Sequence, residues 1–128
     1  MINLSAGLAY LHQALRRQAD NRQYLIAQSF SFLHKYHSIR LRSANVMERQ
    51  EAHFNLGRSY HIVNLHHLAI PYYLAVFQEK DREGQRPEKA VSTEETGIVR
   101  ECQYNLRLCY LAKTNSAVAK RLLYKMVL

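Results

Sequence analysis

Apolar residues recur at intervals of three and four positions along most of the chain, the spacing that lines one face of an α-helix. Near the N-terminus, for example, Leu4, Leu8 and Leu11 lie on one such stripe. Only four Gly and two Pro occur among the 128 residues, so few positions would interrupt a helix. The pattern therefore predicts an all-α fold of antiparallel helix pairs. Three pairs are expected: residues 4–17 and 23–37, residues 47–63 and 67–78, and residues 93–113 and 117–127.

Short polar segments are predicted to turn the chain within each pair. The first pair turns at residues 19–21. The second turns at Asn64, because Asn accepts the left-handed conformation found after a helix C-terminus. The third is expected to turn at Asn115 and Ser116, with Ser116 as the N-cap of the last helix.

A charged segment separates the second pair from the third. Residues 80–92 lack periodic apolar positions and contain Gly84 and Pro87, which predicts a mobile loop. The chain is therefore divided into a first helical pair with its basic connector, a second pair, the loop and a third pair. These parts are residues 1–45, 46–79, 80–92 and 93–128.

A heptapeptide occurs twice, 50 residues apart, in the first helices of the second and third pairs. The two copies are Phe54-Asn55-Leu56-Gly57-Arg58-Ser59-Tyr60 and Tyr104-Asn105-Leu106-Arg107-Leu108-Cys109-Tyr110. Both keep an aromatic residue, an Asn, a Leu and a final Tyr. Nine residues after that Tyr each copy has an Ala, and a large apolar residue follows four positions later. Repeated helix pairs build stacked arrays that present binding surfaces and rarely carry out chemistry.

The second pair resembles a tetratricopeptide repeat. That motif has Leu-Gly, a Tyr three residues later, an Ala nine residues further on and an aromatic residue four after the Ala. The matching residues are Leu56, Gly57, Tyr60, Ala69 and Tyr73. Gly57 and Ala69 are expected to let the helices approach closely, while Leu56, Tyr60 and Tyr73 fill the seam. The third pair matches less completely, and the first pair is interpreted as a degenerate repeat. The resemblance implies a right-handed superhelix of about three helix pairs.

A narrower resemblance covers most of the chain, including the first pair. It rests on three segments, residues 7–22, 55–73 and 101–106. These segments are similar to the C-terminal region of the tetratricopeptide-bearing (tau) subunit of general transcription factor IIIC, a factor that serves RNA polymerase III. The resemblance implies a nuclear protein–protein interaction scaffold that helps to assemble the initiation complex on tRNA-type genes. The implied partners are the other subunits of transcription factor IIIC and the recruited initiation factor IIIB.

In tetratricopeptide arrays the first helix of each pair lines the inner face, where partner segments bind. The residues that the resemblance places on this face are Phe54, Asn55, Arg58, His61, Tyr104 and Asn105. In many such arrays an Asn at the position of Asn55 and Asn105 bonds the backbone of a bound peptide. A hydrogen bond to a neighbouring helix explains both Asn residues equally well.

The chain is basic, with 18 Lys and Arg against 10 Asp and Glu and a net charge of +8. Such a balance favours contact with phosphates or with an acidic partner, although a solvated helix face has the same composition. The candidate residues for these contacts are Arg16, Arg17, Arg22, Arg40, Arg42, Lys120, Arg121 and Lys125. Two alternative functions remain open: a basic helical module that contacts the DNA backbone, and a tetratricopeptide adaptor of another complex.

The sequence lacks the motifs of common enzymes and metal sites. It contains no Gly-rich phosphate loop, nucleophile elbow or Glu-x-x-His motif, so we predict no catalytic residues, no cofactor and no small-molecule substrate. His34 and His37 are three residues apart and His66 and His67 are adjacent, but neither pair has a Cys or carboxylate at suitable spacing. Because zinc requires three or four convergent ligands, we predict no metal site.

The two cysteines and the apolar runs also bear on location. Cys102 and Cys109 are seven residues apart on one predicted helix, about 10 Å along its axis, which is too far for a disulfide. They are expected to be buried free thiols in a reducing compartment. The longest apolar run, residues 68–77, is too short to span a bilayer. No membrane association is predicted.

Overall fold

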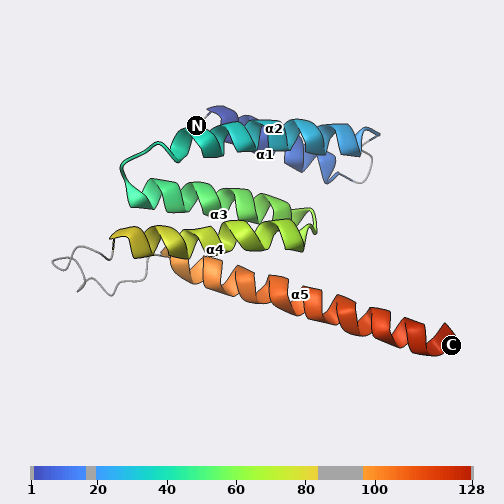
Figure 1. Ribbon diagram of the computed structural model, residues 1–128. Helices are drawn as coiled ribbons and strands as arrows, with labels where there is room; N and C mark the ends of the chain where they lie inside the picture. Colours follow the sequence, from blue (N-terminus) through green and yellow to red (C-terminus); the bar gives the residue numbers. More distant parts are fainter. Residues whose placement is uncertain (1, 17–19, 84–96, 128) are drawn as a thin grey trace.

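The computed structural model describes residues 2–16, 20–83 and 97–127, and the regular structure in these ranges is α-helical (Figure 1). The helices are α1 (Ile2–Ala14), α2 (Arg22–Arg40), α3 (Val46–Ile62), α4 (His66–Glu83) and α5 (Gly97–Val127). α1 packs antiparallel to α2, and α3 packs antiparallel to α4 (Figure 1). The predicted all-α fold with packed helix pairs is therefore confirmed.

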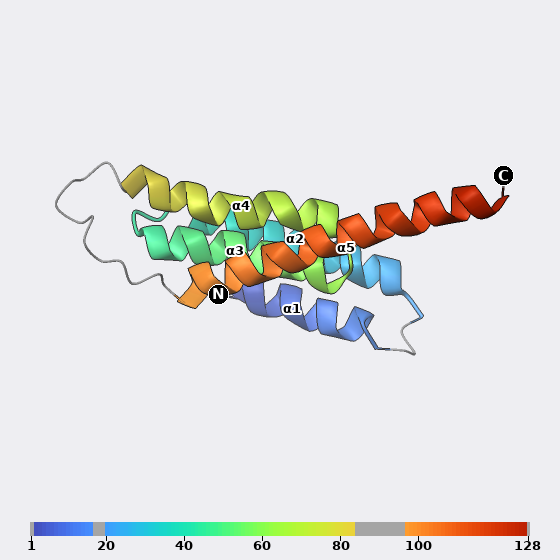
Figure 2. The same ribbon diagram turned by 90° about the horizontal axis from the view of Figure 1, so that it is seen from below.

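The helices stack in chain order. α2 packs on α3, and α4 packs on α5, so each pair contacts the element that follows it. α5 also contacts α3. Figure 2 shows α5 crossing α3 and α4 and continuing beyond the end of the pairs, so its C-terminal half projects from the stack.

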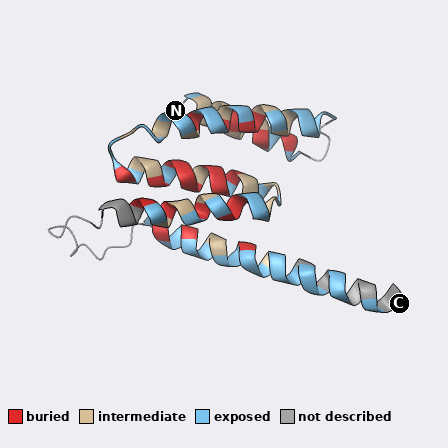
Figure 3. Ribbon diagram, in the orientation of Figure 1, coloured by how far each residue is buried: buried red, intermediate tan, exposed pale blue. Residues whose placement is uncertain are grey.

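The core consists of two clusters that follow the seams between helices (Figure 3). One cluster joins α1, α2 and α3 and contains Leu11, Leu33 and Leu56, each almost fully buried. The other joins α3, α4 and α5 and contains Tyr73 and Val99 among its buried residues. α3 contributes to both clusters, which couples the first pair to the rest of the stack.

The α3–α4 seam has the close approach that the sequence predicts. A Cβ added at Gly57 would lie 2.9 Å from the Cδ1 and Cε1 atoms of Tyr73 and 3.4 Å from the carbonyl oxygen of Ala69. Gly57 is thus required because the Tyr73 ring and the α4 backbone occupy the space of a side chain. Leu56 was expected in the same seam, but it is buried in the other cluster, against the first pair.

The first pair has the same kind of contact, which the sequence analysis missed. A Cβ at Gly7 would lie 2.7 Å from Leu33 Cγ and 3.1 Å from the carbonyl oxygen of Ser29. The Ser29 hydroxyl also donates a 2.8 Å hydrogen bond to the carbonyl oxygen of Gly7. Gly7 precedes Ser29 and Leu33 by 22 and 26 residues, whereas Gly57 precedes Ala69 and Tyr73 by 12 and 16. The connection between the helices is longer in the first pair, and the contact also lies farther from it, so the different spacing hid the match.

Local chemistry explains where the helices of the second pair begin and end. The side chain of Asn45 accepts a 2.9 Å hydrogen bond from the backbone N–H of Met47 and so caps the start of α3. Asn64 has a φ of 64°, which confirms the predicted left-handed turn between α3 and α4. Pro71 lies within α4 without ending it. Because Pro71 has no N–H, one backbone hydrogen bond is missing near the start of α4, but the helix continues past it.

The predicted third helix pair is wrong, because α5 is one continuous helix of 31 residues. The helix runs through Asn115 and Ser116, where a turn was expected. Position 116 is therefore inside a helix and does not begin one. Residues of these types disfavour a helix by less than about 1 kcal/mol each, which a helix this long tolerates. The Thr114 hydroxyl donates a 2.9 Å hydrogen bond to the carbonyl oxygen of Tyr110, one turn earlier in the same helix.

The predicted loop at residues 80–92 is partly helical, since α4 continues to Glu83. The remainder of the loop lies outside the described residues. Among the described helices, none is both long enough and apolar enough to cross a membrane.

Candidate functional site

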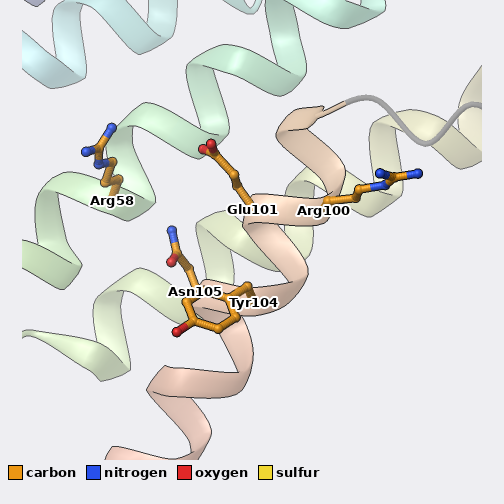
Figure 4. A pocket seen from close by; sticks show the side chains of 5 residues that line it. All are labelled: Arg58, Arg100, Glu101, Tyr104 and Asn105. Carbon is orange, nitrogen blue, oxygen red and sulfur yellow. The ribbon is translucent and has the colours of Figure 1, made fainter.

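A hollow of about 480 Å³ lies between α3 and α5 (Figure 4). It forms because α5 packs on α4 through the face that carries the buried residues Val99, Cys102 and Cys109. The neighbouring side of α5 then faces α3 across a gap. The residues that line the hollow are Arg58, Arg100, Glu101, Tyr104 and Asn105.

The lining is polar and carries charges of both signs. In Figure 4, Glu101 and Asn105 extend from α5 toward α3, while Arg58 rises from α3 on the opposite side. Arg100 points away from Arg58 in this view. The open groove thus combines charged groups of both signs with the exposed ring of Tyr104, a lining that suits a peptide segment.

Three of the six predicted inner-face residues line this hollow. Arg58, Tyr104 and Asn105 come from two helices that are far apart in the sequence, and the structure brings them together. Tyr104 is 64% exposed, so its ring is accessible. Arg58 comes from the first copy of the heptapeptide, and Tyr104 and Asn105 come from the second.

The other three predicted residues have contacts inside the fold. Phe54 is 5% exposed and belongs to the core cluster of α3, α4 and α5, so it does not lie on an accessible face. Asn55 donates a 3.1 Å hydrogen bond to the Tyr36 hydroxyl. His61 Nδ1 shares a 3.2 Å hydrogen bond with the Tyr73 hydroxyl, and burial lowers the pKa of His61, with a smaller effect from His66.

The two repeated Asn residues have equivalent contacts. Asn55 on α3 bonds the Tyr36 hydroxyl on α2, and the side chain of Asn105 on α5 bonds Tyr73 on α4. Each Asn thus reaches back to a Tyr on the preceding helix of the stack. Of the two interpretations of these residues, the contact with a neighbouring helix is the one present in the structure.

The predicted basic contact residues lie in three separate places. Arg16 and Arg22 are at the α1–α2 turn, and Arg22 Nε donates a 3.0 Å hydrogen bond to the carbonyl oxygen of Ala14. Arg40 and Arg42 are at the opposite end of α2, where Arg40 forms an ion pair with Glu48. The third group lies exposed on the projecting part of α5, and Arg17 is outside the described residues. That third group is Lys120, Arg121 and Lys125.

A polar network, which sequence reasoning missed, joins α2, α3 and α4. His37 Nε2 lies 2.9 Å from His53 Nδ1, and His53 Nε2 lies 3.4 Å from a carboxylate oxygen of Glu79. Arg49 Nε donates to the other oxygen of Glu79 at 2.9 Å. Burial, with the neighbouring His53 and His34, lowers the pKa of His37 to about 4. Only the separate His and Glu positions were visible in the sequence, because their spacing follows no motif.

The polar network and the two cysteines lack the features of a metal site or a reactive thiol in the described part of the chain. Among the described residues, no group of three or more His, Cys, Asp and Glu side chains is arranged to hold a metal ion. Cys102 and Cys109 are buried and free, as predicted. Burial raises the pKa of Cys102 to about 12, and its thiol donates a 3.2 Å hydrogen bond to the carbonyl oxygen of Tyr73. A thiol in this state is a poor nucleophile at neutral pH.

Comparison with known proteins confirms the resemblance to transcription factor IIIC. No protein-family model matches the chain. The "Transcription factor tau subunit sfc4" of Schizosaccharomyces pombe is 41% identical over 122 residues, which are 91% of this chain and 12% of that protein. The "Transcription factor tau 131 kDa subunit" of Saccharomyces cerevisiae is 38% identical over 81 residues, 63% of this chain and 8% of the relative.

A human protein extends the comparison beyond fungi. The "General transcription factor 3C polypeptide 3" of Homo sapiens is 35% identical over 118 residues, 92% of this chain and 12% of the relative. The chain thus spans about an eighth of the length of two of these relatives and less of the third. It is therefore homologous to one segment of the transcription factor tau (transcription factor IIIC) subunits.

Proposed function

We propose that this chain is a protein–protein interaction segment of a transcription factor IIIC subunit and acts in the nucleus. In this role it helps to assemble the RNA polymerase III initiation complex on tRNA-type genes. The relatives are named as subunits or polypeptides of this factor, which supports membership in the same complex. The partners we propose are the other subunits of transcription factor IIIC and the initiation factor IIIB.

The observation that carries the proposal is the hollow between α3 and α5. An open groove with Arg58, Glu101 and Tyr104 on its walls suits a polypeptide segment, because it presents an aromatic surface flanked by charges of both signs. The heptapeptide is repeated, and the residues of both copies meet at this groove. We take the groove as the main partner site.

A pull-down against the remaining subunits of factors IIIC and IIIB tests the proposal. Arg58→Ala combined with Glu101→Ala should lower the affinity for the bound subunit by roughly thirtyfold, because charged anchors in a groove contribute about 2 kcal/mol to binding. Both residues are exposed and lie outside the two core clusters, so the helicity measured by circular dichroism should not change. His61 is unsuitable for this test, since it bonds Tyr73 inside the second pair.

The matched control is Lys113→Ala combined with Lys120→Ala, which removes two exposed charges of α5 outside the groove. If this control abolishes partner binding and the groove variant does not, the groove is not the partner site. A titration with duplex DNA at several salt concentrations examines the alternative of backbone contact. Steep salt dependence without sequence preference would identify a DNA-binding module, whereas the scattered basic groups support only weak binding.

A further inference from the structure

From Tyr104 onward, α5 carries an apolar face that the described residues leave exposed. Tyr104, Leu111 and Val118 are 64%, 52% and 49% exposed, and Leu108 is also exposed. Tyr104, Leu108 and Leu111 follow steps of four and three residues, and Val118 lies one heptad after Leu111, so all four share one face of the helix, with the polar Asn115 between the last two. We call these four residues the α5 stripe. Figure 1 shows the distal part of α5 extending away from the other helices.

The α5 stripe is separate from the face that holds α5 in the stack. Val99, Cys102 and Cys109 are buried against the other helices, and they lie about half a helical turn away from the stripe. Beyond Cys109, none of the described side chains of α5 is buried. An isolated helical segment of about 15 residues is only marginally stable in water, so a partner on the stripe would also stabilise the helix.

The charge of α5 indicates which kind of partner fits. After Glu101 the helix contains no Asp or Glu through Val127. Arg107 and Arg121 are two heptads apart and therefore lie on the same edge of the stripe. The basic residues after Glu101 are Arg107, Lys113, Lys120, Arg121 and Lys125. A second copy of this helix would bring like charges together, whereas an acidic partner gains attraction along the same edge.

We propose that the α5 stripe is the docking surface for an acidic amphipathic helix of a partner protein. The apolar residues of the partner pack at heptad spacing on Leu108, Leu111 and Val118, and its carboxylates lie beside Arg107 and Arg121. The stripe continues along α5 from Tyr104, which also lines the hollow between α3 and α5, but Leu108, Leu111 and Val118 do not line the hollow. The inference therefore does not depend on the groove function.

Fluorescence anisotropy with a synthetic peptide tests this surface on the 128-residue chain. The probe is a three-heptad peptide with Leu at the a and d positions and Glu at the e and g positions. Leu111→Gln combined with Val118→Gln should weaken its binding by roughly tenfold or more. The matched control, Tyr110→Gln with Ala117→Gln, changes exposed positions off the stripe and should alter affinity by less than about twofold.

A charge exchange makes the test specific. Arg107→Glu combined with Arg121→Glu should reverse the preference, so that a peptide with Lys in place of Glu binds better. The inference is overturned if the peptide does not bind, or if the Glu and Lys peptides bind the unchanged chain equally. It is also overturned if sedimentation shows a dimer that the stripe substitutions dissociate, because a second copy then occupies the stripe. Binding of duplex DNA that needs Arg121 but not Leu111 and Val118 would likewise assign this helix to a different partner.

Discussion

Replacement of Gly57 by Leu examines the contact that joins α3 to α4. Even the Cβ of the new residue would lie 2.9 Å from two ring atoms of Tyr73. Ordinary carbon contacts are half an ångström or more longer, so the ring must move before the rest of the Leu side chain is placed. Tyr73 is fully buried, and its hydroxyl is bonded to His61, so it has little room to move.

The expected loss of stability follows from three terms. Overpacking of a filled seam costs about 1–3 kcal/mol, and the loss of a hydrogen bond to the Tyr73 hydroxyl costs about 1 kcal/mol. Leu is the better helix former by about 0.8 kcal/mol, which acts in the opposite direction. The free energy of unfolding should therefore fall by about 2 kcal/mol. For a chain of this size the Tm should drop by roughly 6–8 °C.

Thermal unfolding followed by circular dichroism measures this change. The matched control is Gly97→Leu, because a Cβ at Gly97 meets nothing within 4 Å and this variant should keep its Tm. Replacing Tyr73 by Leu in the Gly57→Leu background should remove part of the clash, so the two changes should be less than additive. An unchanged Tm for Gly57→Leu, or an equal drop for Gly97→Leu, would refute the reasoning.

Three further outcomes follow from the buried polar groups. Glu79→Gln removes the charge that pairs with Arg49, so urea unfolding should show a loss of about 2 kcal/mol; a loss below about 0.5 kcal/mol would show that the pair adds little. His37 has a folded-state pKa of about 4 against an ordinary value of 6.5. The unfolded chain therefore binds the extra proton between these values, and stability should fall as pH drops from 6.5 toward 4. The urea midpoints at pH 7 and pH 5 measure this fall, which should be smaller in His37→Gln. Cys102 and Cys109 should react with a thiol reagent only after unfolding, and rapid labelling of both in the native chain would contradict their burial.

Much of the fold could be predicted from local signals. The periodic stripes identified the helices of the first two pairs, since a buried face must repeat with the helical period. Gly57 and Ala69 indicated the close crossing of α3 and α4, because only small residues leave room there. The resemblance to transcription factor IIIC rested on short segments such as residues 67–73, and the comparisons confirm it. Part of the candidate groove was also visible, through the repeated heptapeptide that contains Arg58 and Asn105.

The remaining features depend on contacts between residues that are distant in the sequence. The sequence alone determined the helix class, the turn at Asn64 and the tight seam at Gly57, because each follows from the chemistry of a few neighbouring residues. The tertiary structure decided that Phe54 is buried, that Asn55 bonds Tyr36 and that α5 continues through Asn115. Asn115 is compatible with a helix, so the chain would turn there only if a second helix could pack back against the first. Which face of α3 or α5 remains open is likewise settled by how the neighbouring helices pack, and local sequence carries no record of that packing.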